Sequence, residues 1–293
     1  MAAGDTITQS LADSLDTVVA SARQVREQEG VMPNLVDKVT LEEGTGTSWR
    51  EISMAALTAQ AITETTRLDN PQQMSDTAFA ITPTVVGIQT LITDRVAARV
   101  NKKSYAQLGS LAQNSIQRKK DEDGLAVIDG ATTQLNTANS ALASGFIAAA
   151  VYQISSNATE PGNPPFRAVF HGFSLKDIWD ELTAAVDTTN RADISGLTAR
   201  VFTEGLRGKI AGCEIYEDGN LTIDSSFDAK GGVFAQEAIV LVQGRSPRTA
   251  TIRREDIGGG ATVMYLYDEY AYGERSAGNW LFEIIADATA PTS

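Results

Sequence analysis

The chain has 293 residues, of which 42% are hydrophobic and 21% charged, so it can bury a substantial core in one large domain or two closely connected ones. Its formal net charge is -13, and no third of the chain is net basic. This charge argues against a surface that binds nucleic acid through clustered lysine and arginine. The single cysteine, Cys213, excludes an intrachain disulfide and fits a reducing compartment. We expect neither a secretory signal nor a membrane span, because no apolar run approaches the roughly 18 residues that a span needs.

The first predicted element is an amphipathic helix over residues 6–28. Apolar residues recur there at steps of three and four, which is the period of one helix face. The members of this stripe are Ile7, Leu11, Leu15, Val18, Val19, Ala22 and Val25. Gly30 and Pro33 are typical of residues that follow the end of such a helix.

Residues 34–83 have a different character, since they are rich in Thr, Ala and Gly and poor in large apolar residues. Strand-like segments at 36–41 and 49–54 flank a turn-forming stretch at 42–47. An isolated hairpin is marginal in water, so we predict an extended two-stranded arm that becomes ordered by lying on another surface. The alternative is a flexible linker, for which several residues are too apolar: Trp49, Ile52, Leu57, Ile62 and Phe79.

Residues 84–128 are predicted to be helical in two parts. The first part carries one apolar stripe, formed by Val85, Val86, Ile88, Leu91, Ile92, Val96 and Val100. The second part begins at Ser104, where Ser104-x-x-Gln107 resembles a capping box, and ends at Gly124. At about 20 residues and about 30 Å, it is predicted to be the longest helix of the chain.

The rest of the chain mixes helices and strands. Helices are predicted from about Ser140 to Ser155, from a capping Ser174 onward, and over 197–206, with a buried strand at 166–170. After Gly208 the apolar pattern changes to period two, which is typical of strands. The predicted strands are 209–216, 233–243, 249–254, 262–267 and 281–286. The predicted fold class is therefore α+β.

The sequence contains no recognisable catalytic or metal-binding constellation. His171 is the only histidine, and with no second histidine and no thiol near it in sequence, it cannot complete a zinc motif. We interpret it as a structural, hydrogen-bonded residue at a strand-to-helix turn, and Cys213 as a small core residue. We accordingly expect no enzyme activity, no catalytic residue, no cofactor and no metal.

Three stretches resemble binding motifs only in part. Gly205-x-x-Gly208-x-x-x-Gly212 follows a predicted helix and lacks the Lys-Ser/Thr ending of a phosphate loop. Gly258-Gly259-Gly260 joins two predicted strands and indicates a hairpin loop. Asp121-Glu122-Asp123-Gly124 lacks the full spacing of a calcium loop, so we interpret it as a solvated helix end.

The order of these elements resembles that of the major capsid proteins of tailed bacteriophages, which have the HK97-type fold. Some local sequence is also similar to a phage capsid subfamily. The similar stretches are Asp94-Arg95, Lys119 to Asp123, Ala148 to Ile154, Pro164 to His171 and Gly278 to Thr289. The resemblance covers nearly the whole chain and rests on order and length more than on a signature.

This resemblance implies a domain plan. Residues 1–33 would form an N-terminal arm and helix, and residues 34–83 the extended hairpin that the family calls the E-loop. Residues 84–139 would form the peripheral domain with its long spine helix. Residues 140–240 would form the axial domain, and the strands of 241–293 would return to the peripheral domain.

The resemblance also implies a function. The chain would self-assemble into hexamers and pentamers of an icosahedral phage head that encloses double-stranded DNA without binding it specifically. Its partners would be further copies of itself, a portal, a separate scaffolding protein and, in some phages, decoration proteins. It would act in the virion, after assembly in the host bacterial cytoplasm, and would not contact a membrane.

Two features of some family members are not expected here. No lysine follows Lys38 until Lys102, so the covalent crosslink that some members form from an E-loop lysine is not expected. Only residues 1–33 precede the arm, where some members carry a long scaffolding region, so we expect a separate scaffold or none.

Within the arm, Trp49, Arg50, Glu51 and Arg67 are the candidate residues for contacts between subunits. The three charged residues would form ion pairs with a neighbouring copy, and the alternative for them is a solvated surface.

Other classes of protein stay open at this point. An encapsulin-type nanocompartment shell would copurify with a cargo enzyme, and a tail-tube or other virion protein would form rings or tubes. A metabolic enzyme would depend on His171.

Overall fold

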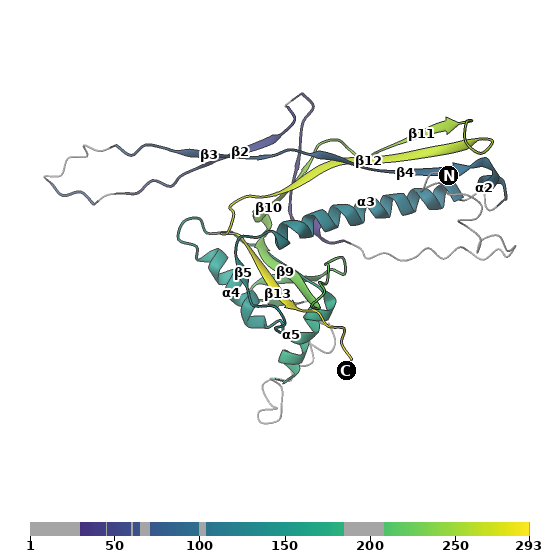
Figure 1. The fold of residues 1–293 in the computed structure, drawn as a ribbon. Helices are drawn as coiled ribbons and strands as arrows, with labels where there is room; N and C mark the ends of the chain where they lie inside the picture. Colours follow the sequence, from purple (N-terminus) through teal and green to yellow (C-terminus); the bar gives the residue numbers. More distant parts are fainter. Residues whose placement is uncertain are drawn as a thin grey trace.

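The computed structural model describes residues 30–44, 46–59, 61–64, 71–99, 104–184 and 208–292. Figure 1 shows three parts: an elongated upper layer, a hairpin that extends away from it, and a compact lower unit beside the C-terminus. Each part contains its own β-sheet.

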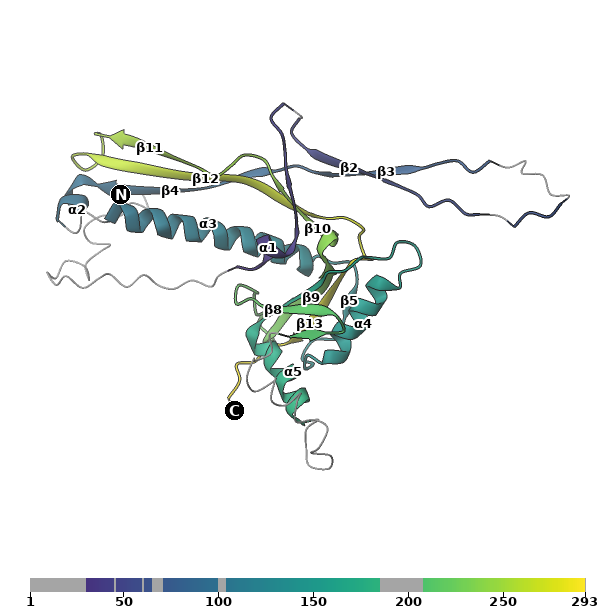
Figure 2. The ribbon, with the colours of Figure 1, turned by 180° about the vertical axis from the view of Figure 1, so that it is seen from behind.

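The upper layer is a five-stranded sheet built around the 14-residue strand β12. β12 pairs antiparallel with β4 along one edge and with β11 and β10 along the other, and β1 adds to β10 in parallel. The bounds are β1 Asp37–Thr40, β4 Thr84–Thr93, β10 Ile239–Gln243, β11 Arg248–Arg254 and β12 Ala261–Glu274. The long helix α3 (Ser104–Asp129) lies beside this sheet in both views (Figures 1 and 2) and packs against β4 and β12.

The lower unit is a six-stranded mixed sheet with two helices against it. The strand order is β5-β13-β9-β6-β8-β7, and the helices are α4 and α5. The strand bounds are β5 Gln134–Leu135, β6 Phe166–Phe170, β7 Lys209–Ile210, β8 Cys213–Glu217, β9 Asp228–Ala235 and β13 Leu281–Asp287. The helix bounds are α4 Ser144–Ser155 and α5 Gly172–Ala184.

The remaining elements are short. β2 (Trp49–Met54) and β3 (Asp76–Ile81) form the hairpin, and they pair only with each other among the described residues. α1 (Met32–Leu35) precedes β1, and α2 (Asp94–Arg99) follows β4. The 3-10 turn η2 (Gln236–Ala238) carries the chain from the lower sheet to the upper one.

Most of the core lies in the lower unit and at its junction with α3. The largest fully buried side chains there include Ile128, Ile147, Ile154, Phe170, Phe234 and Ile284. A smaller cluster of Ile81, Val240 and Val242 joins the root of the hairpin to the upper sheet. Because the hairpin beyond its root adds nothing to either cluster, the body folds without burying that part of the chain.

The sequence-based prediction of a helix from residue 84 is wrong, because Thr84–Thr93 forms strand β4 and helix begins only at Asp94. The apolar residues of this run fit both a helical stripe and a strand of β-branched residues. The ten-residue antiparallel pairing with β12 decides between the two, and it is a contact with residues far along the chain.

The prediction that Gly124 ends the long helix is also wrong, since α3 continues to Asp129. A Cβ at position 124 would lie 2.9 Å from Met32 Cβ and 3.1 Å from Tyr272 Cζ. The glycine is therefore needed for close packing of α1 and β12 on the helix, and it does not terminate it.

Further boundaries differ from the sequence-based predictions. The strand predicted over 209–216 is the pair β7 and β8, and the helix predicted from about Ser140 begins at Ser144. Residues 233–243 form two strands in different sheets instead of one, because the turn η2 interrupts them. Ser174 does not cap α5, which begins two residues earlier at Gly172. By contrast, the predicted strands 49–54 and 166–170 have the observed bounds, and the loop at Gly258–Gly260 joins β11 to β12 with positive φ angles. The predicted helices at 6–28 and 197–206 lie outside the described residues.

A buried ion pair joins α3 to the upper sheet. The ammonium group of Lys120 lies 3.2 Å from Asp268 Oδ2 of β12, and it also donates to Gln243 and lies over the ring of Tyr270. The side chains of Lys120 and Asp268 are 9% and 1% exposed, so neither charge is compensated by water.

We predict that Lys120→Met destabilises the fold by about 3–5 kcal/mol, because it leaves the Asp268 carboxylate buried without a cation. The matched control is Lys119→Met on the same helix, whose exposed pair with Asp123 contributes about 1 kcal/mol or less. The free energies of urea unfolding of the two unassembled variants measure this difference. Equal losses in both variants would contradict the assignment.

Candidate assembly surface

The structure agrees with the sequence-based interpretation of His171 and Cys213 as structural residues. The Nδ1 atom of His171 accepts a hydrogen bond of 3.1 Å from the backbone N–H of Phe173, and the two rings meet edge to face. Burial lowers the pKa of His171. Cys213 is fully buried, and burial raises the pKa of its thiol to about 12, so the reactive thiolate is suppressed.

The interpretation of Asp121 to Gly124 as a solvated helix end is wrong. Asp121 is fully buried and accepts a 2.9 Å hydrogen bond from the backbone N–H of Met32. Asp123 accepts a hydrogen bond of 2.9 Å from the hydroxyl of Tyr270. These acids bind parts of their own chain, and the described ranges contain no cluster of three or more potential metal-ligating residues.

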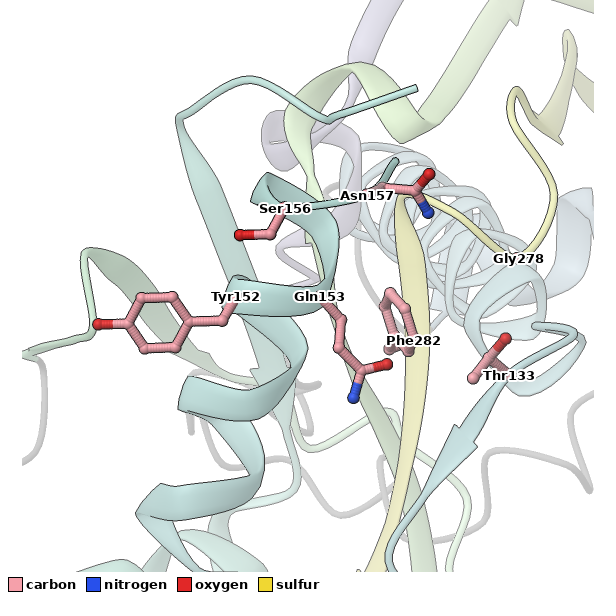
Figure 3. A pocket seen from close by; sticks show the side chains of 7 residues that line it. All are labelled: Thr133, Tyr152, Gln153, Ser156, Asn157, Gly278 and Phe282. Atoms are coloured by element: carbon pink, nitrogen blue, oxygen red, sulfur yellow. The ribbon is translucent and has the colours of Figure 1, made fainter. Parts of the chain in front are cut away.

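A groove lies between α4 and the lower sheet and has a volume of about 490 Å³. Figure 3 shows Gln153 reaching toward the ring of Phe282 while the ring of Tyr152 points away from it. The lining side chains are hydroxyls, amides and aromatic rings: Thr133, Tyr152, Gln153, Ser156, Asn157 and Phe282, beside Gly278. With no charged residue in its lining, the groove offers no carboxylate, imidazole or ammonium group for acid–base chemistry.

The hairpin β2–β3 has two faces of different character. In the observed register, Trp49 lies opposite Ile81 and Glu51 opposite Phe79, and side chains of these residues point to one side. We call this side the root face, because it meets the body at the base of the hairpin. Its residues are buried or half-buried, with the rings of Trp49 and Phe79 in edge-to-face contact at 6.3 Å.

Arg275, at the end of β12, holds the root face in place. Its guanidinium lies 2.7 Å from Glu51 Oε2 and 2.8 Å from Asp37 Oδ2, and it donates to the carbonyl of Glu237. It also lies over the ring of Trp49, 5.8 Å from the centroid. With its side chain only 17% exposed, Arg275 joins hairpin, upper sheet and the η2 turn at one point.

Gly273 provides the space for this joint. A Cβ at position 273 would lie 2.6 Å from Ile81 Cδ1 and 2.9 Å from the ring of Phe79. The absence of a side chain on β12 therefore lets the root face approach the sheet backbone.

The opposite side of the hairpin, which we call the free face, contacts nothing in the described structure that buries it. It carries Arg50, Ile52 and Met54 on β2, opposite Ala80, Ala78 and Asp76 on β3. Ile52 is 59% exposed and Met54 68% exposed, whereas large apolar side chains of this kind are usually buried. Leu57, Ile62 and Met74, farther out on the same arm, are exposed to a similar degree.

The arm remains extended beyond its two named strands. The backbone N–H of Ala55 donates to the carbonyl of Ser75, and Thr58 and Gln72 are joined by hydrogen bonds between backbone and side chain. Figure 1 shows this arm pointing away from the upper sheet. No helix in the described ranges has the length and apolar character that crossing a bilayer requires.

The structure places the sequence-predicted contact residues on different faces. Arg50 lies on the free face and forms no ion pair with a described residue, whereas Trp49 and Glu51 lie on the root face and contact Arg275. Arg67 lies outside the described residues. Arg275 and Gly273 were missed, because the sequence around them gives no local sign of a contact with residues 49–81.

No family model matches the chain, and neither does any curated protein sequence. Solved structures do resemble it. A structure from Mycobacterium phage Che8 is 17% identical, with a TM-score of 0.69, and the match covers 91% of this chain and 96% of that one. The capsid of the cyanophage P-SCSP1u is 13% identical, with a TM-score of 0.69 and 93% of both chains covered. The head of Helicobacter pylori bacteriophage KHP40 is 11% identical, with a TM-score of 0.71, and the match covers 92% and 94% of the two chains.

These matches span almost the full length of both partners, so the likeness concerns the whole architecture and not one shared motif. The sequence resemblance implied an α+β fold like that of phage capsid proteins. The matches confirm this fold.

We predict that Arg275→Gln loosens the hairpin root, because Glu51 and Asp37 lose a charged partner. A charge-assisted hydrogen bond contributes about 1.5–3 kcal/mol, so amide hydrogen exchange over residues 49–54 should accelerate by about one to two orders of magnitude. The matched control, Arg50→Gln on the free face, should leave exchange in the unassembled chain unchanged. Equal acceleration by both variants would show that Arg275 does not hold the root.

Proposed function

We propose that the chain is the major capsid protein of a tailed bacteriophage, a structural subunit that assembles into a closed head. The observation that carries the proposal is the free face of the hairpin on a chain with the fold seen in phage capsids. Such a face gains stability only when it lies on another surface, and in a shell that surface is a neighbouring copy.

The energetics favour association through this face. Fully burying one large aliphatic side chain contributes about 1.5–3 kcal/mol, and the arm exposes Ile52, Met54, Leu57, Ile62 and Met74. Two copies that exchange arms around a rotation axis would each gain such a contact, and stable interfaces bury about 1,000 Å² or more.

We assign the sequence-predicted residues different roles in this assembly. Arg50, on the free face, is proposed to pair with an acidic residue of the adjacent copy, and Arg67 to do the same farther along the arm. Trp49 and Glu51 would act indirectly, because they set the direction in which the arm leaves the body.

The wider architecture of the proposal follows the family resemblance. Residues 34–83 would be the E-loop, 84–139 the peripheral domain with α3 as spine helix, and 140–240 the axial domain. Residues 1–33 would be the N-terminal arm, and the strands of 241–293 would complete the peripheral domain. Hexamers and pentamers of such subunits would form an icosahedral head.

The same proposal includes partners and location. Double-stranded DNA would be enclosed without specific binding, which fits a net charge of -13. A portal, a scaffolding protein and decoration proteins would be partners, and the protein would reside in the virion after assembly in the bacterial cytoplasm. It would perform no enzymatic reaction.

We predict that the purified chain, alone or with its phage's scaffolding protein, forms closed shells of uniform size in negative-stain electron microscopy. A monodisperse monomer under both conditions would contradict the proposal, and rings or open tubes would indicate a tail protein instead. Shells that copurify with one cargo enzyme and hold no DNA in infected cells would indicate an encapsulin-type compartment.

We further predict that the double variant Ile52→Asp, Met54→Asp folds but does not assemble, because it places two charges on the free face. Ser53→Asp is the control, since it adds a charge to the same strand on the opposite face. Circular dichroism checks folding, and sedimentation velocity measures the assembled fraction, which should fall at least tenfold in the double variant alone. Loss of assembly in the control to the same extent would remove the free face as the cause.

A further inference from the structure

Two buried carboxyl groups meet beside Gly30 to Met32, the first residues of the chain that the structure describes. Asp121 of α3 and Asp218, just after β8, are 0% and 1% exposed and lie within hydrogen-bonding reach of each other. Buried carboxylates normally have a cation beside them, because an unpaired charge in the interior is costly.

The partners of this pair are neutral. The backbone N–H of Met32 donates to Asp121 Oδ1 at 2.9 Å, and that of Val31 lies 3.4 Å from Asp218 Oδ2. Asn220 bridges the two acids, with its backbone N–H 2.8 Å from Asp218 Oδ1 and its Nδ2 2.9 Å from Asp121 Oδ2. The acids thus hold both each other and the segment that leads into α1.

The charged and titratable groups of the surrounding elements do not neutralise the pair. On α3, Lys120 is directed to Asp268, and Asp123 accepts from Tyr270. Tyr272 of β12 has a buried hydroxyl without a hydrogen-bond partner among the described residues, and its pKa is raised by burial and by Asp121. On the side of β8, Glu217 adds a further negative charge, and residues 30–35 carry no titratable side chain.

Two adjacent buried carboxylates repel each other strongly, so a single proton between them removes the repulsion and supplies a hydrogen bond. Gly30 packs directly on the side chain of Asp121, which leaves no room for a side chain at position 30. The two acids thus hold the backbone of Val31 and Met32, next to the apolar packing of Met32 in the core.

We propose that protonated Asp218 donates to Asp121 and that the two side chains act as a clasp, which holds residues 30–32 on the body and holds them less tightly once Asp218 loses its proton. The clasp is a property of the single chain, so it stands or fails independently of shell assembly.

The pH dependence has a defined sign. Burial, followed by the contact with Asp121, raises the pKa of Asp218 to about 7. A raised folded-state pKa stabilises the closed form fully below the unfolded-state value, and this stabilisation is lost as the pH rises toward 7. Between pH 6 and pH 8 the equilibrium constant for opening should therefore rise about tenfold.

Amide hydrogen exchange of the full-length chain tests the proposal, followed by mass spectrometry of a peptide that contains residues 31–36. After correction for the intrinsic pH dependence of exchange, opening of the wild-type segment should increase about tenfold between pH 6 and pH 8, while peptides of β13 show no change. A flat wild-type profile would overturn the proposal without any variant.

Asp218→Asn is the decisive variant, because its amide can donate to Asp121 as the protonated acid does. Its profile should be flat and should match the wild-type protection at pH 6. Asp76→Asn, which removes an exposed acid from the hairpin, should keep the wild-type profile. If Asp218→Asn retains the full pH dependence, another group is responsible and the clasp is excluded.

Discussion

A two-stranded hairpin can bury only one of its faces on its own chain, and here the second face is left in solvent. The root face is held by Arg275 and packs over Gly273, so the base of the arm has a fixed direction. Beyond the base, backbone pairing and the hydrogen bonds between Thr58 and Gln72 maintain the arm, while its apolar side chains stay exposed. The body therefore has its own buried core, whereas the apolar side chains on the free face of the arm stay exposed.

Strand β12 connects this arm to the rest of the molecule. Its residue Asp268 holds α3 through Lys120, and the end of the same strand leads to Arg275, which holds the arm. A force on the arm is thus transmitted to the central strand of the upper sheet and from there to the long helix. An arm attached to a loop would turn freely, whereas this attachment fixes the direction in which the arm leaves the body.

The sequence predicted those features that local pattern determines. Residues 49–54 and 166–170 alternate or cluster apolar residues over a strand's length, and their bounds were found. The run at 84–93 fits a helical stripe equally well, and only its pairing with β12, some 170 residues later, makes it a strand. The prediction that Gly124 ends the helix was wrong for a similar reason, because the side chains that require a glycine there are those of the distant residues Met32 and Tyr272.

The candidate site was predictable only in part. The apolar content of the arm indicated that it needs another surface, and Arg50, one of the predicted contact residues, lies in the structure on the face that remains open. The division into two faces depends on register, and the role of Glu51 depends on Arg275, which is more than 200 residues away. A local pattern gives neither, because the register pairs two strands that a long connection separates, and the partner of Glu51 lies outside the arm.

One turn of α3 shows how charge specifies the junction of the parts. Lys120 points to β12, Asp121 to the N-terminal segment and Asp218, and Asp123 to Tyr270. The only cation buried in this turn is already committed to Asp268, so the interior holds more carboxyl groups than it can neutralise with lysine. A proton is the remaining source of compensation for the pair Asp121 and Asp218. The stretch that looked from sequence like a solvated helix end is instead the place where β12, α3 and residues 30–32 are held together, and its excess of acids makes that contact sensitive to pH.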